Sequence, residues 1–303
     1  NDDNTPSESV YDIIADNPNF ETFLTAVHKL GIDADLKSNA KDYTIFVPDE
    51  SGFNEFLAEN GYADIDAVPT AVLEQIVRNH IVEGQVMSSA SLIEESSGYL
   101  ATLAEEATTM NNIDMFYYDN NGDLTLNGTS VITAPDMKAS NGIVHRVDAV
   151  IAIPDILTFI NRDPSLKRLS EAIGLVSADD PSFSQALMDF SAPAPYTFLA
   201  PDDNAIDSAL ANELGGVTLQ NLQESGDLEN LLDLHIITDI NILSSDLTNG
   251  MVIMTQNGEI TVNVEGSTVS FTDPNDRTVT VIRANIQAGN GVIHILDSVL
   301  LPL

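Results

Sequence analysis

Residues 290–299 read NGVIHILDSV, and residues 141–150 read NGIVHRVDAV. The two segments align without a gap, so that His145 corresponds to His294 at an offset of 149 residues. A long match at such a distance indicates a duplicated structural unit, which has to be recognised before any single element is interpreted. This pair of segments therefore decides how the rest of the chain is divided.

Three further pairs of segments follow in the same order along the chain: residues 43–50 with 196–203, 79–82 with 234–237, and 17–20 with 163–166. Each copy ends in an apolar stretch closed by a proline, Pro154 and Pro302. The repeat predicts two domains, residues 10–154 and 155–303, with almost no linker between them. Residues 1–9 are polar and acidic, and they are predicted to be a flexible leader.

Each copy opens with helical patterns and closes with strands. Apolar residues recur at helical spacing over residues 10–30, with a break predicted at Asn17-Pro18 and an end at Gly31. Residues 70–80 predict a second amphipathic helix, residues 43–47 a buried strand, and the Asn-Gly pairs at 121–122 and 257–258 two hairpins. Helices followed by antiparallel strands predict an α+β fold.

Charge and composition exclude several classes of function. The chain of 303 residues holds 11 Lys and Arg against 47 Asp and Glu, a net charge of −36. Such a surface repels nucleic acid, so a nucleic-acid partner is not expected; solubility in a salty medium and a cationic partner are alternative explanations. The absence of cysteine excludes disulfides and thiol catalysis, and no apolar stretch reaches the ~18 residues of a membrane span.

The combination of YTFLAPDD at 196–203, a helix ending in His235, and the closing segment at 290–302 resembles the fasciclin domain. The first copy departs from the pattern at Arg146 and by one extra residue before Pro154. The resemblance covers nearly all of the chain. It implies two tandem fasciclin-like domains, each a β-wedge or sandwich of mostly antiparallel strands flanked by helices. It also implies a non-enzymatic module for adhesion to cells or matrix.

The resemblance implies a setting outside the cytoplasm, either secreted or on a cell surface. Residues 1–9 are similar to the tether that follows the lipidated cysteine of many bacterial surface lipoproteins. We therefore expect a secreted protein or one held at the outer membrane by a lipid anchor that precedes residue 1. The expected partner is a protein or a glycan on a cell surface or in a matrix.

In animal matrix members of this family, integrin binding is assigned to a Tyr-His pair and to an Asp-Ile motif before Asn-Gly. The tyrosine is missing in both copies, where Asn79 and Leu234 precede the histidines. Integrin binding is therefore not expected, and adhesion to a different receptor stays open. The corresponding positions are the candidate contact residues: His80, Asp136 and Met137 in the first copy, and His235, Asn285 and Ile286 in the second.

The paired histidines His80, His145, His235 and His294 lie on apolar faces, which favours core histidines bonded to the backbone. The alternative is one metal or catalytic site per domain, although two histidines fall short of the ~3 protein ligands of an open zinc site. We predict no catalytic residue, metal or cofactor. A binding protein for a metal or small ligand, using the paired histidines or an interdomain cleft, is the alternative, and a hydrolase comes third.

The remaining repeated residues are assigned a structural role. They are Asn141, Gly142, His145 and Asp148 in the first copy, and Asn290, Gly291, His294 and Asp297 in the second. Asp148 is out of phase with His145 on an ideal strand, which argues against a His–Asp dyad. The acidic stretch at residues 119–123 has its glycine in the wrong place for an EF-hand loop, so it is predicted to be a turn.

Overall fold

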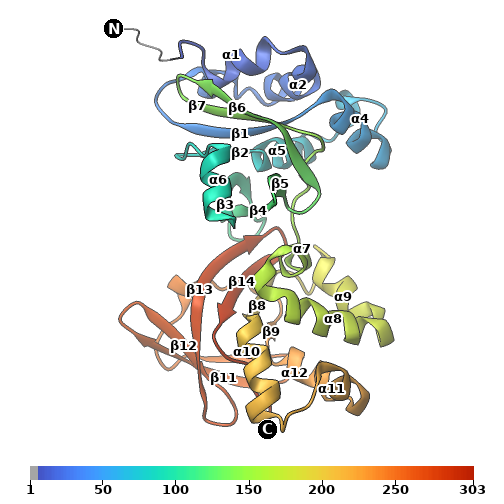
Figure 1. Cartoon of the computed structure of the whole chain (residues 1–303), viewed down its shortest axis with the longest axis vertical. Helices are drawn as coiled ribbons and strands as arrows, with labels where there is room; N and C mark the ends of the chain where they lie inside the picture. The colour runs from blue at the N-terminus through green and yellow to red at the C-terminus, as the bar shows by residue number, and fades with distance from the viewer. Residues whose placement is uncertain (1–5) are drawn as a thin grey trace. The chain divides into compact units, whose positions relative to one another are not determined.

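The computed structural model describes residues 6–303. They form two compact units, one of the residues up to Glu105 with Asn112–Ile153, the other of Glu106–Asn111 with Pro154–Leu303 (Figure 1). These units are called domain 1 and domain 2 below. The division falls close to the repeat boundary near Pro154. The exact domain limits, 10–154 and 155–303, stay a prediction.

Domain 1 begins with helices and ends with strands. Its helices are α1 (Val10–Ala15), α2 (Glu21–Leu30), α3 (Asp33–Lys37), α4 (Glu50–Glu59), α5 (Thr70–Asn79) and α6 (Ser89–Glu95), with 3-10 turns η1 (Pro18–Phe20) and η2 (Ile65–Ala67). Its strands are β1 (Tyr43–Pro48), β2 (Ile81–Glu83), β3 (Ser97–Glu105), β4 (Asn112–Asn120), β5 (Asp123–Leu126), β6 (Ser130–Ala139) and β7 (Gly142–Val147).

Domain 2 repeats this order. Its helices are α7 (Ile156–Arg162), α8 (Lys167–Asp179), α9 (Pro181–Met188), α10 (Asp203–Ser208), α11 (Leu219–Ser225) and α12 (Asp227–Asp233), with short turns η3 (Pro164–Leu166), η4 (Ala209–Glu213) and η5 (Ser244–Asp246). Its strands are β8 (Tyr196–Pro201), β9 (Ile236–Ile237), β10 (Val252–Thr255), β11 (Gly258–Glu265), β12 (Thr268–Thr272), β13 (Thr278–Ala288) and β14 (Gly291–Leu296).

Within residues 6–303 each domain builds one seven-stranded sheet with the same topology. The order is β2-β1-β7-β6-β5-β4-β3 in domain 1 and β9-β8-β14-β13-β12-β11-β10 in domain 2. The closing strand runs parallel to the first strand, β7 beside β1 and β14 beside β8, and every other pairing is antiparallel. Two mostly antiparallel sheets flanked by helices confirm the predicted α+β class.

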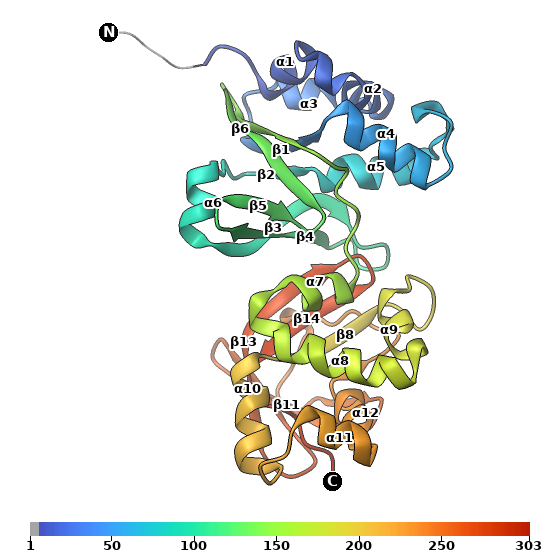
Figure 2. The ribbon, with the colours of Figure 1, turned by 45° about the vertical axis from the view of Figure 1, so that its right-hand side comes forward.

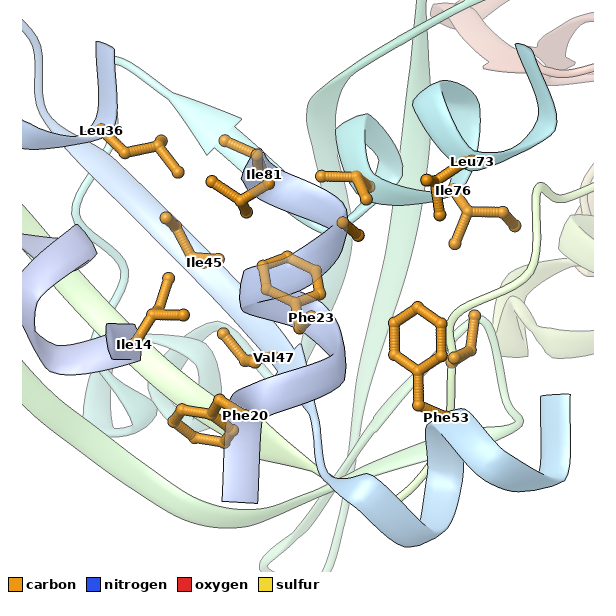
Figure 3. Packing of buried hydrophobic residues seen from close by; sticks show 14 of the residues in the cluster. Ile14, Phe20, Phe23, Leu36, Ile45, Val47, Phe53, Leu73, Ile76 and Ile81 are labelled. Carbon is orange, nitrogen blue, oxygen red and sulfur yellow. The ribbon is translucent and has the colours of Figure 1, made fainter. Parts of the chain in front are cut away.

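The helices of domain 1 cover the end of the sheet where β1 and β7 pair. Figure 2 shows α1 and α3 above β1 and β6. In Figure 3, Phe23 of α2 and Phe53 of α4 approach Ile76 of α5 and Val47 of β1. Phe23, Phe53 and Val47 are completely buried or nearly so. This aliphatic and aromatic cluster fixes α5, and with it the position of His80 at the helix end.

Local signals in the sequence set the helix limits. Asn17 caps η1 through its side chain, and Pro18 occupies the first position, where no N–H is needed. Gly31 ends α2 in the left-handed conformation at φ 68°. Both observations confirm the predicted break and stop.

The end of the predicted leader needs a correction. Residues 1–5 lie outside the described residues. Ser9 is 4% exposed and forms a capping box with Asp12 at the start of α1, while the Glu8 carbonyl accepts a hydrogen bond from the Ser140 amide. Glu8 and Ser9 are therefore part of domain 1. Within residues 6–303, no helix is both long enough and apolar enough to cross a bilayer.

Candidate functional site

The closing segment of each domain begins with a buried asparagine that joins three parts of the chain. Asn141 accepts a hydrogen bond from the Val10 amide at 2.8 Å and donates to the carbonyls of Leu36 and Ser38. In domain 2, Asn290 accepts from the Ile156 amide and donates to the carbonyls of Leu187 and Asp189. Each side chain thus fixes the first helix and the end of a later helix to the closing strand.

The glycine after each asparagine allows the closing strand to approach the first strand. Gly142 has φ 149°, and a Cβ added there would lie 2.0 Å from the Tyr43 carbonyl oxygen. Gly291 pairs with Tyr196 in the same register. Any side chain at Gly142 would push β7 off β1, which explains why the repeat keeps glycine at this position.

The repeated aspartate ends the closing strand. Asp148 accepts a hydrogen bond at Oδ1 from the Val131 amide at 2.7 Å, and Asp297 accepts one from the Thr280 amide at 2.8 Å. These bonds complete the pairing between the closing strand and the strand before it. Among residues 6–303, neither carboxylate is hydrogen-bonded to a histidine ring.

His80 and His235 occupy the ends of equivalent helical segments inside the core. His80 is 0% exposed and donates from Nδ1 to the Ile76 carbonyl at 2.7 Å, while its Nε2 accepts from the Ile151 amide at 2.9 Å. The ring of His235 makes the same two bonds, with the Leu231 carbonyl and the Leu300 amide. Both nitrogens of each ring are engaged with backbone.

Burial keeps these two rings uncharged. Removal from water lowers the pKa of His80 to about 4, although the hydrogen bond to Ile76 opposes the shift. Burial likewise lowers the pKa of His235 to about 4. Protonation of the His80 ring would also turn Nε2 into a donor. The Ile151 amide would then face a second donor and lose its hydrogen-bond acceptor. Near neutral pH the rings therefore act as neutral connectors between a helix and the end of the closing segment.

His145 and His294 hold a loop against a bulged strand. His145 donates from Nε2 to the Met87 carbonyl at 2.8 Å and accepts at Nδ1 from the Asp136 amide at 3.2 Å. His294 bonds in the same way to the Ile242 carbonyl and the Asn285 amide. Burial lowers the pKa of both rings.

Asp136 and Asn285 lie at β-bulges in the strands that precede the closing strands. The register shifts between Ala134 and Met137 in β6, and between Arg283 and Ile286 in β13. Asp136 has φ 61° and Asn285 has φ 63°, a left-handed conformation that Asp and Asn tolerate better than most residues. The bulge turns both side chains toward the loop that carries a serine.

The two side chains hold that serine in nearly the same way. Asp136 accepts from the amide and the hydroxyl of Ser89, and Asn285 accepts from the Ser244 amide at 2.8 Å and donates to its hydroxyl at 2.8 Å. Partial burial alone would raise the pKa of Asp136, but the bonds from Ser89 outweigh it and the pKa is lowered. The side-chain amide of Asn285 in domain 2 thus holds its serine as the Asp136 carboxylate does in domain 1.

The six candidate contact residues fall into two groups. His80, His235 and Ile286 are buried, and Met137 is half-buried against the core of domain 1. The three buried side chains offer no surface to a partner in this structure, whereas Met137 keeps part of its surface exposed. Asp136 is partly exposed and Asn285 is exposed.

Exposed neighbours of the two bulges were not identified from the sequence. They are Pro135 and Lys138 in domain 1, and Ile282 and Arg283 in domain 2. Together with Asp136 and Asn285 they are called the bulge surface here. Each bulge thus has an apolar side chain, a cation and an Asp or Asn within three residues, in a chain with only 11 cations. Exposure on a bulged strand has no sequence pattern, because the bulge breaks the alternation of faces.

Metal ligands do not converge in the described residues. No group of three or more His, Cys, Asp or Glu there is placed to hold a metal ion. Residues 119–123 span the turn at Asn121 and Gly122 between β4 and β5, where Asp119 accepts a hydrogen bond from the Gly122 amide. His28 is exposed on α2 and bonds to the Tyr11 hydroxyl at 2.8 Å.

Comparison with known proteins gives a consistent assignment. The sequence model of the fasciclin domain matches residues 18–154 and 167–302. Human stabilin-1 is 23% identical over 283 residues, covering 88% of this chain and 10% of stabilin-1. The pig transforming growth factor-beta-induced protein ig-h3 is 26% identical over 266 residues, covering 86% of this chain and 35% of that protein. The chain therefore spans only a small part of these relatives.

A solved structure shares the fold of this chain. It is a FAS1 domain pair from the insect cell adhesion molecule Fasciclin I, with a TM-score of 0.54 and 16% sequence identity. The match covers 93% of this chain and 97% of that structure. At this identity the likeness concerns the fold.

Proposed function

The chain belongs to the fasciclin domain family, and on that basis we propose that it works outside the cytoplasm as a non-enzymatic module for adhesion or protein interaction. Its structural relative is part of an insect cell adhesion molecule, which supports this class of function. The proposed partner is a protein or glycan on a cell surface or in a matrix. Secretion, or a lipid anchor ahead of residue 1, is part of the same proposal.

One observation carries the non-enzymatic part of the proposal. Both ring nitrogens of His80, His145, His235 and His294 are bonded to backbone groups. A general base or a metal ligand needs a ring nitrogen that faces the substrate or the ion. Recruiting any of these rings would break a bond that joins a helix or loop to the closing segment.

We place the contact with the partner at the bulge surface. Its side chains are exposed, or partly exposed at Asp136, and the strand beneath them is fixed by His145 or His294 and by the bond to Ser89 or Ser244. A contact patch on a rigid strand loses little conformational entropy on binding. Lys138 additionally offers local positive charge to an acidic protein or glycan despite the net charge of −36.

The experiment that tests the proposed function is adhesion of coated beads. Beads carrying the purified chain would be applied to cells and to matrix, with and without calcium, beside beads carrying an unrelated protein of equal net charge. Adhesion above the control is the expected result. Adhesion equal to the control in both conditions would reject the adhesion function.

The metal-binding alternative has its own measurement. The purified chain would be dialysed and its zinc and copper content determined. The bonding of the four rings predicts less than stoichiometric metal. One metal ion per domain that survives dialysis would require these rings to leave their backbone partners and would favour the alternative.

A further inference from the structure

Domain 2 carries a groove that is separate from the bulge surface. It has a volume of about 1130 Å³ and lies between α11, α12, the β10–β11 turn and the last residues of the chain. All of its lining residues belong to residues 214–303, and none is part of the bulge surface. The volume lies near the upper end of the ~300–1,000 Å³ typical of ligand pockets, so the groove has room for a short chain segment.

Apolar side chains line the groove from several elements. Val217, Leu222 and Leu231 come from the helical side, and Pro274 and Leu301 from the opposite turn and chain end. Leu222 is buried, while Val217 and Leu231 are half-buried and keep part of their surface exposed. An apolar side chain placed here would gain about 25 cal/mol for each Å² it removes from water.

The charges at the groove have one sign. Asp227 and Glu259 are its charged lining side chains, and both are exposed. Arg277 follows the turn that forms one wall, but its guanidinium is paired with Glu213 and Asp273 and donates to the Val299 carbonyl. Arg277, the cation closest in sequence to the wall at Pro274 and Asn275, is thus neutralised inside the domain. The groove therefore presents negative charge.

The uncharged polar groups of the groove also present acceptors. Asn257 donates its amide nitrogen to the Asn230 carbonyl at 2.7 Å. Asn275 donates its amide nitrogen to the carbonyls of Leu301 and Pro302, both at 2.9 Å. Asn275 thus has both of its amide N–H groups engaged and Asn257 has one engaged, while both side-chain oxygens remain acceptors. Carboxylates and amide oxygens around an apolar lining complement a ligand that combines cationic donors with apolar groups.

We propose that this groove is a docking site for a peptide segment of a partner protein that alternates basic and apolar side chains. The apolar side chains would fill the space beside Val217, Leu231 and Pro274, and the basic ones would pair with Asp227 and Glu259. This interaction is independent of the bulge surface and adds a second partner site to domain 2.

Fluorescence anisotropy with the whole chain tests this site. The probes are three labelled eight-residue peptides, of alternating Lys and Leu, Lys and Ser, and Glu and Leu, in physiological salt. The Lys–Leu peptide should bind saturably, and the other two at least about tenfold more weakly, because only the first satisfies both the charge and the apolar lining. Equal binding of the Lys–Leu and Lys–Ser peptides would overturn the proposal, because net charge alone would then account for it.

A matched pair of variants locates the binding. Asp227→Asn combined with Glu259→Gln should weaken the Lys–Leu peptide about tenfold, as expected for the loss of two partly screened ion pairs. Glu94→Gln combined with Asp123→Asn removes the same charge from exposed sites in domain 1 and should change the affinity less than about twofold. Equal loss in both pairs would overturn the proposal. Thermal unfolding of each variant establishes that it is folded.

Discussion

The ring of His80 accepts a hydrogen bond from the backbone amide of Ile151, 71 residues further along the chain, at a distance of 2.9 Å. The other ring nitrogen donates to the Ile76 carbonyl within the preceding helix. His235 makes the equivalent pair of bonds in domain 2. One side chain therefore joins the central helix of each domain to the end of its closing segment, which is why the histidine recurs in both copies.

This bonding predicts that acid destabilises both domains. With a folded pKa of about 4 against an unfolded value of 6.5, His80 and His235 bind fewer protons in the folded state between these two pH values. Stability is fully present above the unfolded pKa and is lost as the pH falls toward the folded pKa. The free energy of unfolding should fall by about 2 kcal/mol per ring between pH 7.5 and pH 5. Urea denaturation at each pH measures it.

Comparison of variants separates the histidines from other titrating groups. The pKa of Asp233 is raised to about 6, mainly by burial, so its protonation has the opposite effect on stability. The His80→Gln variant should show a shallower decrease with acid in domain 1. If that variant does not fold, the ring signals of His80 and His235 in the native protein, followed by NMR, decide the question: they should not titrate between pH 7.5 and pH 5. Titration of the His80 ring near 6.5 would contradict this account.

Loss of the asparagine at the start of a closing segment should be costly. Asn290→Ala removes three hydrogen bonds, two to carbonyls at Leu187 and Asp189 and one to the Ile156 amide. Leaving these buried groups without partners should cost about 3 kcal/mol in the free energy of unfolding. Urea denaturation provides the value. Asn285→Ala, at an exposed position, is the matched control and should cost about 1 kcal/mol; equal costs would mean that Asn290 has no special structural role.

Two glycine substitutions should act in opposite directions. Gly142→Ala places a Cβ 2.0 Å from the Tyr43 carbonyl oxygen and should destabilise domain 1 by more than about 3 kcal/mol, because β7 must move away from β1. Gly174→Ala, inside α8 with no atom within 4 Å of the added Cβ, should stabilise domain 2 by up to about 1 kcal/mol. Thermal melting of both variants would measure the difference, and a neutral Gly142→Ala would refute the close approach.

Asn285 occupies in domain 2 the position of Asp136 in domain 1, so the two domains together indicate how Asp136→Asn will affect stability. Asp136→Asn should keep the bonds to Ser89, as Asn285 does to Ser244, and should change stability by less than about 1 kcal/mol. Asp136→Ala should release the Ser89 amide at the start of α6 and cost more. Hydrogen exchange at the Ser89 amide distinguishes the two variants. Faster exchange in Asp136→Asn than in Asp136→Ala would contradict the assignment.

Much of the fold follows from the sequence because its signals are local. The Asn17-Pro18 break, the stop at Gly31 and the Asn-Gly hairpins each depend on backbone preferences of one or two residues. The repeat places only part of these signals twice: Asp163-Pro164 begins η3 as Asn17-Pro18 begins η1, whereas Gly174 lies inside α8. Where residues 256–257 turn between β10 and β11, the equivalent strands β3 and β4 are joined by the longer loop Glu106–Asn111, whose Glu106 is buried and bonded to Thr108 and Thr109. No local signal predicts that loop.

The candidate site followed less directly from the sequence. Periodicity placed His80 and His235 on apolar faces, yet the same residues were also chosen as contacts through the family resemblance, and their burial removes them from the surface. The bulges at Asp136 and Asn285 invert the alternation of neighbouring side chains, so the exposure of Ile282 and the burial of Ile286 depend on tertiary structure. The groove of domain 2 joins segments far apart in the sequence and has no linear pattern.

Adhesion of beads coated with a bulge-surface variant tests the central claim most directly. The variant combines four exposed substitutions: Pro135→Ser, Lys138→Ser, Ile282→Ser and Arg283→Ser. The control removes two cations and two exposed apolar side chains elsewhere: Arg162→Ser, Lys167→Ser, Val252→Ser and Met254→Ser. We predict that the bulge-surface variant, with an unchanged melting temperature, loses adhesion to cells and matrix while the control retains it. Full adhesion by the bulge-surface variant would contradict the account.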